Sequence, residues 1–306
     1  MSEHNHIHEN SNHTDKYEQV LSKYELHIHD EDVHAAVNKI TASQIAENNN
    51  DEVKRFLFSC LEITSLRVTD NEENILSLTE RVNDFTNDYP NIPHPAAICV
   101  YPCFASIVSQ SLEVEGVGIT CVTGGFPSSQ TFPEVKTIET ALARKDGATE
   151  IDIVLPVGKF LVGDYESISE EIDEIKDYCE GGKLKVILET GALQTAENIK
   201  KAAIIAIYSG ADFIKTSTGK ISPAATPEAV YVMCQTIKEY HEKTGTQIGL
   251  KIAGGINTID DALVYYTICK EILGSEWLKP ELFRIGTSKL ANELAIEITG
   301  VNKKFF

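Results

Sequence analysis

From Val53 onward the chain alternates short runs of β-branched residues with longer amphipathic segments. This rhythm is typical of βα units, because neighbouring parallel strands need a crossover connection and a helix usually provides it. The sequence predicts an α/β protein with eight strands, at Cys60–Thr64, Ala96–Tyr101, Gly118–Thr123, Glu150–Leu155, Leu184–Glu189, Asp212–Lys215, Gln247–Ile252 and Leu282–Ile285.

The segments between these strands have helical periodicity, and three of them carry clear start signals. Thr195, Thr226 and Thr258 each stand where a side-chain oxygen can cap a first helical turn, and Pro227 fits the first helical position. Eight such units fit the about 250 residues of one (β/α)8 TIM barrel. An open doubly wound sheet fits less well, because neither G-x-G-x-x-G nor a P-loop is present. The predicted helices are Leu76–Asp88, Phe104–Leu112, Glu134–Lys145, Tyr165–Cys179, Ala196–Ser209, Pro227–Lys243, Ile259–Leu273 and Ser288–Ile298.

Residues 1–50 differ from the rest and are predicted to be an N-terminal extension to a barrel domain at 51–306. They hold three Lys against nine Asp and Glu, seven of the nine histidines, and no Gly, Pro or Cys. The polar start favours disorder, with transition-metal binding by the histidines as the alternative. After Asp30, apolar residues recur at near-helical spacing and predict a helix. The histidines in question are His4, His6, His8 and His13.

The net charge of −19 excludes some classes of partner. Nucleic acids and anionic membranes require a positive surface, so neither is expected to bind. The longest apolar stretch, Ala202 to Tyr208, is far below the roughly 18 residues of a membrane span. Seven scattered cysteines favour a reducing cytoplasm, and the isolated pair Cys99 and Cys103 is a poor zinc signature. We therefore expect a cytoplasmic protein without a metal.

The fourth strand places a carboxylate inside the barrel. Ile151, Ile153 and Leu155 form an apolar face suited to packing on helices, so Asp152 points to the interior. An interior charge is costly unless it is paired. By itself Asp152 fits a structural ion pair as well as a catalytic group.

Two lysines lie near the carboxyl ends of neighbouring strands, where barrel enzymes place their chemistry. The sixth strand ends on Lys215, and the seventh carries Lys251 in its last residues. Two ammonium groups side by side repel each other and burial disfavours charge, so at least one pKa should fall. A neutral amine can form a Schiff base with a carbonyl, and an aspartate can move protons. Phosphate binding by both lysines remains the alternative.

Glycine turns predict an anion site at the same end of the barrel. Gly254 and Gly255 follow the seventh strand, Gly286 and Ser288 follow the eighth, and each turn leads into a helix. Barrels commonly bind phosphate at these loops, through backbone N–H groups and helix N-termini. A local group of lysines can focus a positive field despite the negative net charge. The lysines expected there are Lys215, Lys220, Lys251 and Lys289.

Five segments together resemble the deoxyribose-phosphate aldolase family over about residues 53–290. The most specific is Ala211-Asp212-Phe213-Ile214-Lys215-Thr216-Ser217-Thr218-Gly219-Lys220, and Gly249-Leu250-Lys251-Ile252-Ala253-Gly254-Gly255-Ile256 supports it. The likeness extends to residues 96–102, 150–154 and 184–191.

The resemblance implies a class I aldolase without cofactor or metal. Such an enzyme reversibly cleaves 2-deoxy-D-ribose 5-phosphate to D-glyceraldehyde 3-phosphate and acetaldehyde. Lys215 would form the Schiff base, and Lys251 and Asp152 would relay protons. The residues implied to contact the phosphorylated sugar are Thr64, Cys99, Gly219, Lys220, Gly254, Gly255, Gly286 and Ser288.

Three positions depart from the family pattern. Glu62 stands where Asp is frequent, Asn257 where some members carry Arg, and Phe306 where some have a terminal tyrosine. We therefore expect one cationic contact to the phosphate to be missing. The tail, without a hydroxyl, is expected to act only by packing. A transaldolase-like sugar-phosphate aldolase and a non-catalytic sugar-phosphate-binding barrel remain alternatives. Whether the chain forms a homo-oligomer is open.

Overall fold

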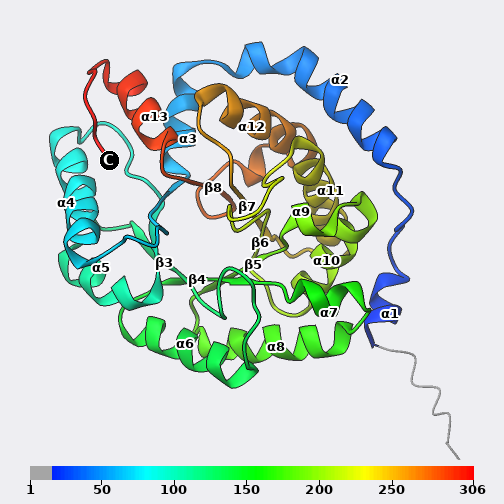
Figure 1. The fold of residues 1–306 in the computed structure, drawn as a ribbon. Coiled ribbons are helices and arrows are strands. Elements are labelled where there is room, and N and C mark those ends of the chain that lie inside the picture. The colour runs from blue at the N-terminus through cyan, green and yellow to red at the C-terminus, as the bar shows by residue number, and fades with distance from the viewer. Residues whose placement is uncertain (1–15) are drawn as a thin grey trace, which may run out of the picture.

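The computed structural model describes residues 16–306 as a closed barrel of eight parallel strands surrounded by helices (Figure 1). The strands follow chain order, and the last pairs with the first. This confirms the predicted (β/α)8 fold, and no strand end differs from its predicted position by more than two residues. The strands are β1 (Leu61–Thr64), β2 (Ala97–Val100), β3 (Gly118–Val122), β4 (Glu150–Val154), β5 (Lys183–Ile187), β6 (Phe213–Lys215), β7 (Gly249–Ala253) and β8 (Phe283–Thr287).

The predicted helices are present, and the expected caps form. The hydroxyls of Thr195, Thr226 and Thr258 each accept a hydrogen bond from a backbone N–H in the first turn. The helix predicted to start at Leu76 begins four residues earlier, at Glu72. Asn71 caps its first turn, which is polar and lacks apolar periodicity. The helices are α4 (Glu72–Asp88), α5 (Ala105–Ser111), α6 (Pro133–Lys145), α8 (Tyr165–Tyr178), α10 (Ala196–Tyr208), α11 (Pro227–Thr244), α12 (Ile259–Leu273) and α13 (Leu290–Thr299).

Short elements that the periodicity did not predict lie in the loops. They are α7 (Val157–Leu161), α9 (Thr190–Leu193) and the 3₁₀ turns Pro102–Phe104 and Ser275–Trp277. A segment of three to five residues is too short to show a helical repeat. Over residues 16–306, no helix is long and apolar enough to cross a membrane.

Three helices precede β1: α1 (Lys16–Leu21), α2 (Asp30–Asn48) and α3 (Asp51–Ser59). The helix expected after Asp30 is α2, which lies along the outside of the ring against α11 and α12 (Figure 1). Val33 and Val37 join the hydrophobic core, and the Asn48 amide donates to Thr267 Oγ1 at 2.9 Å. The predicted disorder and the four histidines lie outside the described residues.

The C-terminal residues pack against the barrel. Phe305 and Phe306 are buried, and their ring centroids lie 5.2 and 5.3 Å from that of Phe85 on α4. Asn292 on α13 accepts hydrogen bonds from both of their backbone N–H groups, at 2.7 and 2.9 Å. This anchoring holds the tail between α4 and α13.

Candidate active site

The barrel places Asp152, Lys215 and Lys251 together inside its wall. Lys215 and Lys251 are register partners on β6 and β7, and Asp152 comes from β4. Asp152 and Lys251 are fully buried, and Lys215 is 3% exposed. Asp152 Oδ2 accepts hydrogen bonds from Lys215 Nζ at 2.8 Å and from Lys251 Nζ at 2.7 Å. One carboxylate oxygen therefore joins both ammonium groups.

Lys185 on β5 is a third lysine in this group, and the sequence interpretation missed it. Its Nζ lies 3.0 Å from Asp152 Oδ1 and 2.5 Å from Glu150 Oε2, and it is fully buried. The test that identified Asp152, a charged residue on the inward phase of a strand, also applies to Leu184-Lys185-Val186. The alternation of residues along this strand therefore predicts that Lys185 points into the barrel.

Glu62 and Arg284 complete the interior ionic cluster. Glu62 accepts a hydrogen bond from Lys251 Nζ, and its Oε1 lies 3.4 Å from both Lys185 Nζ and Arg284 Nη1. Arg284 Nη2 donates to Glu150 Oε1 at 3.0 Å. Glu62, a departure from the family pattern, is thus a buried partner of Lys251. The cluster consists of three carboxylates (Glu62, Glu150, Asp152) and four basic groups (Lys185, Lys215, Lys251, Arg284).

The balance of charge in this cluster favours one neutral base. Three carboxylates compensate three cations, and an additional buried charge is costly. Burial and the nearby charge of Lys251 lower the pKa of Lys215, although Asp152 opposes this shift. Burial acts in the same sense on Lys251, but the carboxylates of Asp152 and Glu62 outweigh it and raise its pKa. Lys215 is therefore the group that loses its proton first.

The aspartate stays ionised beside these lysines. Burial alone would raise the pKa of Asp152, but the charges of Lys185, Lys215 and Lys251 hold it well below its usual range. An ionised Asp152 keeps its hydrogen-bond acceptors directed at the lysines. The arrangement places an amine of lowered pKa, a lysine of raised pKa and an ionised carboxylate within hydrogen-bond distance of one another.

A cavity of about 260 Å³ opens at this mouth of the barrel. Seven of the predicted substrate-binding residues line it together with Lys215: Thr64, Gly219, Lys220, Gly254, Gly255, Gly286 and Ser288. Gly254 and Gly255 have φ values of +93° and +85°, which glycine adopts without strain. A Cβ on Gly254 would lie 2.5 Å from Ser217 Oγ, so this loop requires glycine.

Two further residues of this mouth cavity bear on the missing phosphate contact. Asn257 lines it, but its side-chain amide donates to the Gly255 carbonyl at 3.0 Å. Arg67, in the loop after β1, lines it too and was not predicted. Arg67 brings a cation to the cavity that Asn257 does not supply. The lysine side chain of Lys220 donates to the Leu66 carbonyl and so ties this loop to the loop after β6.

Cys99 is placed differently from the other predicted residues. It is fully buried in β2 beside Thr64 and is not among the residues that line the mouth cavity. Burial raises the pKa of its thiol, which favours the protonated form. Cys99, Glu62 and Asp152 have ligand atoms within 4.8 Å of one another. Both carboxylates already form ion pairs with Lys251, so a metal cation bound between these three residues would be repelled by the ammonium group.

The fold and this cluster define a class of protein, a (β/α)8 barrel enzyme with a lysine-based site at the carboxyl ends of its strands. A family model described as DeoC/LacD family aldolase matches residues 64–271, and the chain belongs to this family.

Named relatives agree with this assignment. Human deoxyribose-phosphate aldolase is 43% identical over 205 residues, which cover 66% of this chain and 64% of the relative. The bovine deoxyribose-phosphate aldolase is 38% identical over 250 residues, which cover 78% of this chain and 79% of the bovine one. The structure of a tetrameric deoxyribose phosphate aldolase from Aeropyrum pernix superposes with a TM-score of 0.67 at 25% identity, covering 85% of this chain and 99% of that one.

Proposed function

We propose that the protein catalyses the reversible cleavage of 2-deoxy-D-ribose 5-phosphate to D-glyceraldehyde 3-phosphate and acetaldehyde. The observation that carries this proposal is the hydrogen-bonded set of Lys215, Asp152 and Lys251 beside the glycine-lined mouth cavity. The names of the human and bovine relatives support the substrate. The glycine turn at Gly254 and Gly255 and the cation of Arg67 line the mouth cavity, and both suit a phosphate.

The first step is attack by neutral Lys215 Nζ on C1 of the open-chain sugar. The carbinolamine loses water and gives an iminium, which withdraws electrons from C2. The C3 hydroxyl loses its proton, the C2–C3 bond breaks, and D-glyceraldehyde 3-phosphate leaves. The electron pair of that bond remains on the enzyme as an enamine. Protonation at C2 and addition of water then release acetaldehyde and free Lys215.

Proton transfer in this scheme falls to Asp152 and Lys251, assisted by a water. Lys251 remains cationic because its two carboxylate partners, Asp152 and Glu62, stabilise its charge. Together with burial, its positive charge lowers the pKa of Lys215.

An acetaldehyde assay tests this substrate assignment. The protein is incubated with 2-deoxyribose 5-phosphate, with and without a chelator, and Lys215→Ala serves as control. We expect acetaldehyde from the wild type at the same rate in both conditions and none from the variant. Turnover of another sugar phosphate without acetaldehyde would contradict the proposal, and so would turnover that the chelator abolishes.

We further propose that the chain forms a homo-oligomer through α6. Val135, Ile138 and Leu142 lie on this helix with 45%, 59% and 54% exposure, and Phe132 precedes it with 73%. Apolar side chains at this spacing form one continuous stripe, which is typical of an interface. Light scattering of the wild type and of Ile138→Asp tests this proposal. We expect an oligomer for the wild type and a smaller species for the variant, and a monomeric wild type would overturn the proposal.

We place the protein in a reducing compartment such as the cytoplasm. The support is that all seven cysteines are free thiols and six of them are buried.

A further inference from the structure

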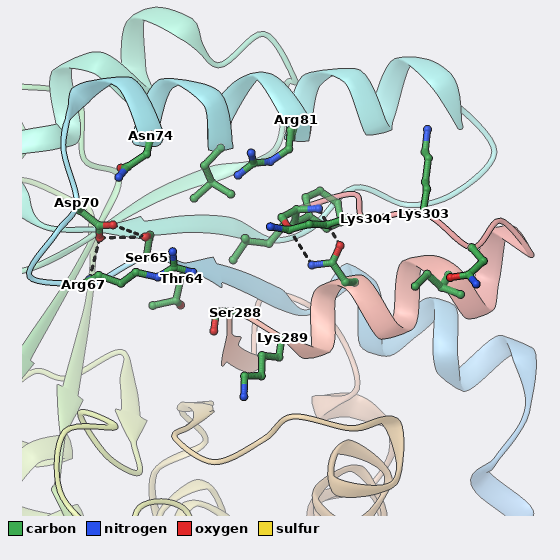
Figure 2. A pocket seen from close by; sticks show the side chains of 16 residues that line it. Thr64, Ser65, Arg67, Asp70, Asn74, Arg81, Ser288, Lys289, Lys303 and Lys304 are labelled. Atoms are coloured by element: carbon green, nitrogen blue, oxygen red, sulfur yellow. Dashed lines mark hydrogen bonds between the residues drawn. The ribbon is translucent and has the colours of Figure 1, made fainter.

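A second cavity lies next to the mouth cavity, between α4, α13 and the last residues of the chain (Figure 2). Its volume is about 680 Å³, larger than that of the mouth cavity and within the range of small-molecule sites. Thr64, Arg67 and Ser288 line both cavities. The second cavity is called the tail cavity below.

Basic side chains dominate the tail cavity. Arg67, Arg81, Lys289, Lys303 and Lys304 line it, against the single carboxylate side chain of Asp70. That carboxylate is already engaged, because its two oxygens accept from Ser65 Oγ at 2.9 Å and one of them also accepts from the Arg67 N–H at 2.8 Å. A basic cavity of this kind is unexpected in a chain with a net charge of −19.

Arg81 carries a buried donor without a partner. Its side chain projects from α4 toward the tail (Figure 2), and Nη1 donates to Ser77 Oγ at 3.1 Å. Within the described residues, Nε is buried and has no hydrogen-bond partner. The contact with Ser77 uses one of the five N–H donors of the guanidinium, so Arg81 retains donors for a ligand oxygen.

Three other cations of the tail cavity are available to a ligand. Over residues 16–306, Arg67, Lys289 and Lys304 make no ion pair with a carboxylate, and all three are exposed. Lys303 differs, because its Nζ lies 3.9 Å from Asp88 Oδ2 and 4.9 Å from the centre of the Phe305 ring. The available positive charge thus comes from the loop after β1, from α4, from the start of α13 and from the tail.

We propose that the tail cavity binds a small polyanion with two or more phosphate groups. Four available cations exceed what one phosphate neutralises, and they lie on separate elements around one cavity. Arg81 and Arg67 suit phosphate because a guanidinium presents several donors in one plane. Leu78, Ile296 and Phe306 form an apolar part of the wall beside these cations.

Isothermal titration with inorganic tripolyphosphate, at fixed ionic strength, tests this site without any assay of turnover. We expect wild-type protein to bind tripolyphosphate and Arg81→Gln/Lys304→Gln to bind it at least tenfold more weakly. Lys279→Gln removes the same kind of charge from an exposed site just before β8, at the other end of the barrel, and should bind like the wild type. The melting temperature of each variant verifies that it is folded.

Lys220→Gln distinguishes the two cavities, because Lys220 lines only the mouth cavity. Binding that is lost in Lys220→Gln and kept in Arg81→Gln/Lys304→Gln would place the polyanion at the mouth and overturn the proposal. Equal weakening in Lys279→Gln, or no binding by the wild type, would overturn it as well. If the double variant does not fold, the exposed single variant Lys304→Gln decides, with an expected weakening of about threefold.

Discussion

Lys215 and Lys251 donate to the same oxygen, Asp152 Oδ2, at 2.8 and 2.7 Å, from register partners on adjacent strands. Two full ammonium charges at this separation repel in a buried setting. Glu62 is a second carboxylate partner of Lys251, whereas Asp152 is the only carboxylate that contacts Lys215 among the described residues. Burial therefore lowers the pKa of Lys215, whereas two carboxylates raise the pKa of Lys251.

Replacing Lys251 tests this relationship. Lys251→Leu removes the neighbouring cation, so the pKa of Lys215 should rise and the amine should become neutral only at higher pH. We expect the pH profile of adduct formation with acetaldehyde to move up by about one unit, which is about tenfold at pH 7. Lys251→Arg keeps the cation and should stay near the wild-type profile. An unchanged profile in Lys251→Leu would contradict the role given to Lys251.

Lys185→Met should destabilise the fold. The change leaves Asp152 and Glu150 without a buried cation that contacts both, at a cost of about 3–5 kcal/mol in the free energy of unfolding. The control is Lys201→Met, which breaks an i,i+4 pair with Glu197 on α10 and should cost about 0.5 kcal/mol. Urea unfolding measures both variants. Equal costs would mean that the interior ionic cluster does not depend on Lys185.

Stability should decrease in acid because of the cluster carboxylates. Burial opposes ionisation of Glu150, but Lys185 and Arg284 outweigh it and lower its pKa to about 2 from 4.5. The folded state therefore favours the ionised form. Its stabilising contribution is complete above the unfolded pKa of 4.5 and is lost as the pH falls toward about 2. Urea midpoints between pH 6 and pH 3 should fall less steeply for Glu150→Gln than for the wild type. Parallel slopes would exclude Glu150 as a source of the effect.

Gly254→Ala should weaken phosphate binding. Its new Cβ would meet Ser217 Oγ at 2.5 Å and Ala224 Cβ at 2.6 Å, at a φ of +93°. The loop must then shift, and we expect the KM for the phosphorylated sugar to rise roughly tenfold, about 1.4 kcal/mol. Gly245→Ala is the matched control, because Gly245 has a φ of +75° with open space around it at the end of α11. A similar KM in the two variants would argue against a phosphate at Gly254.

The barrel could be predicted because its strands and helices follow local sequence patterns. Some contacts of the site, however, form only when the sheet closes into a barrel. Strand and helix periods indicate the eight units, and the rule that successive strands of a barrel are neighbours places Lys215 beside Lys251. The contacts of Glu62 with Lys251 and of Arg284 with Glu150 join strands across the interior. Those pairs depend on strand stagger, which the sequence pattern does not report. Lys185 differs from these pairs, because its position on the inward phase of β5 already predicts that it lies inside the barrel.

Reductive trapping tests the central claim most directly. The protein is incubated with acetaldehyde and borohydride, digested, and its peptides are analysed by mass spectrometry. We predict a single reduced adduct of acetaldehyde on Lys215, with Lys185 and Lys251 unmodified because their raised pKa values keep them cationic. An adduct on Lys251 or Lys185 instead, or none on Lys215, would contradict the account.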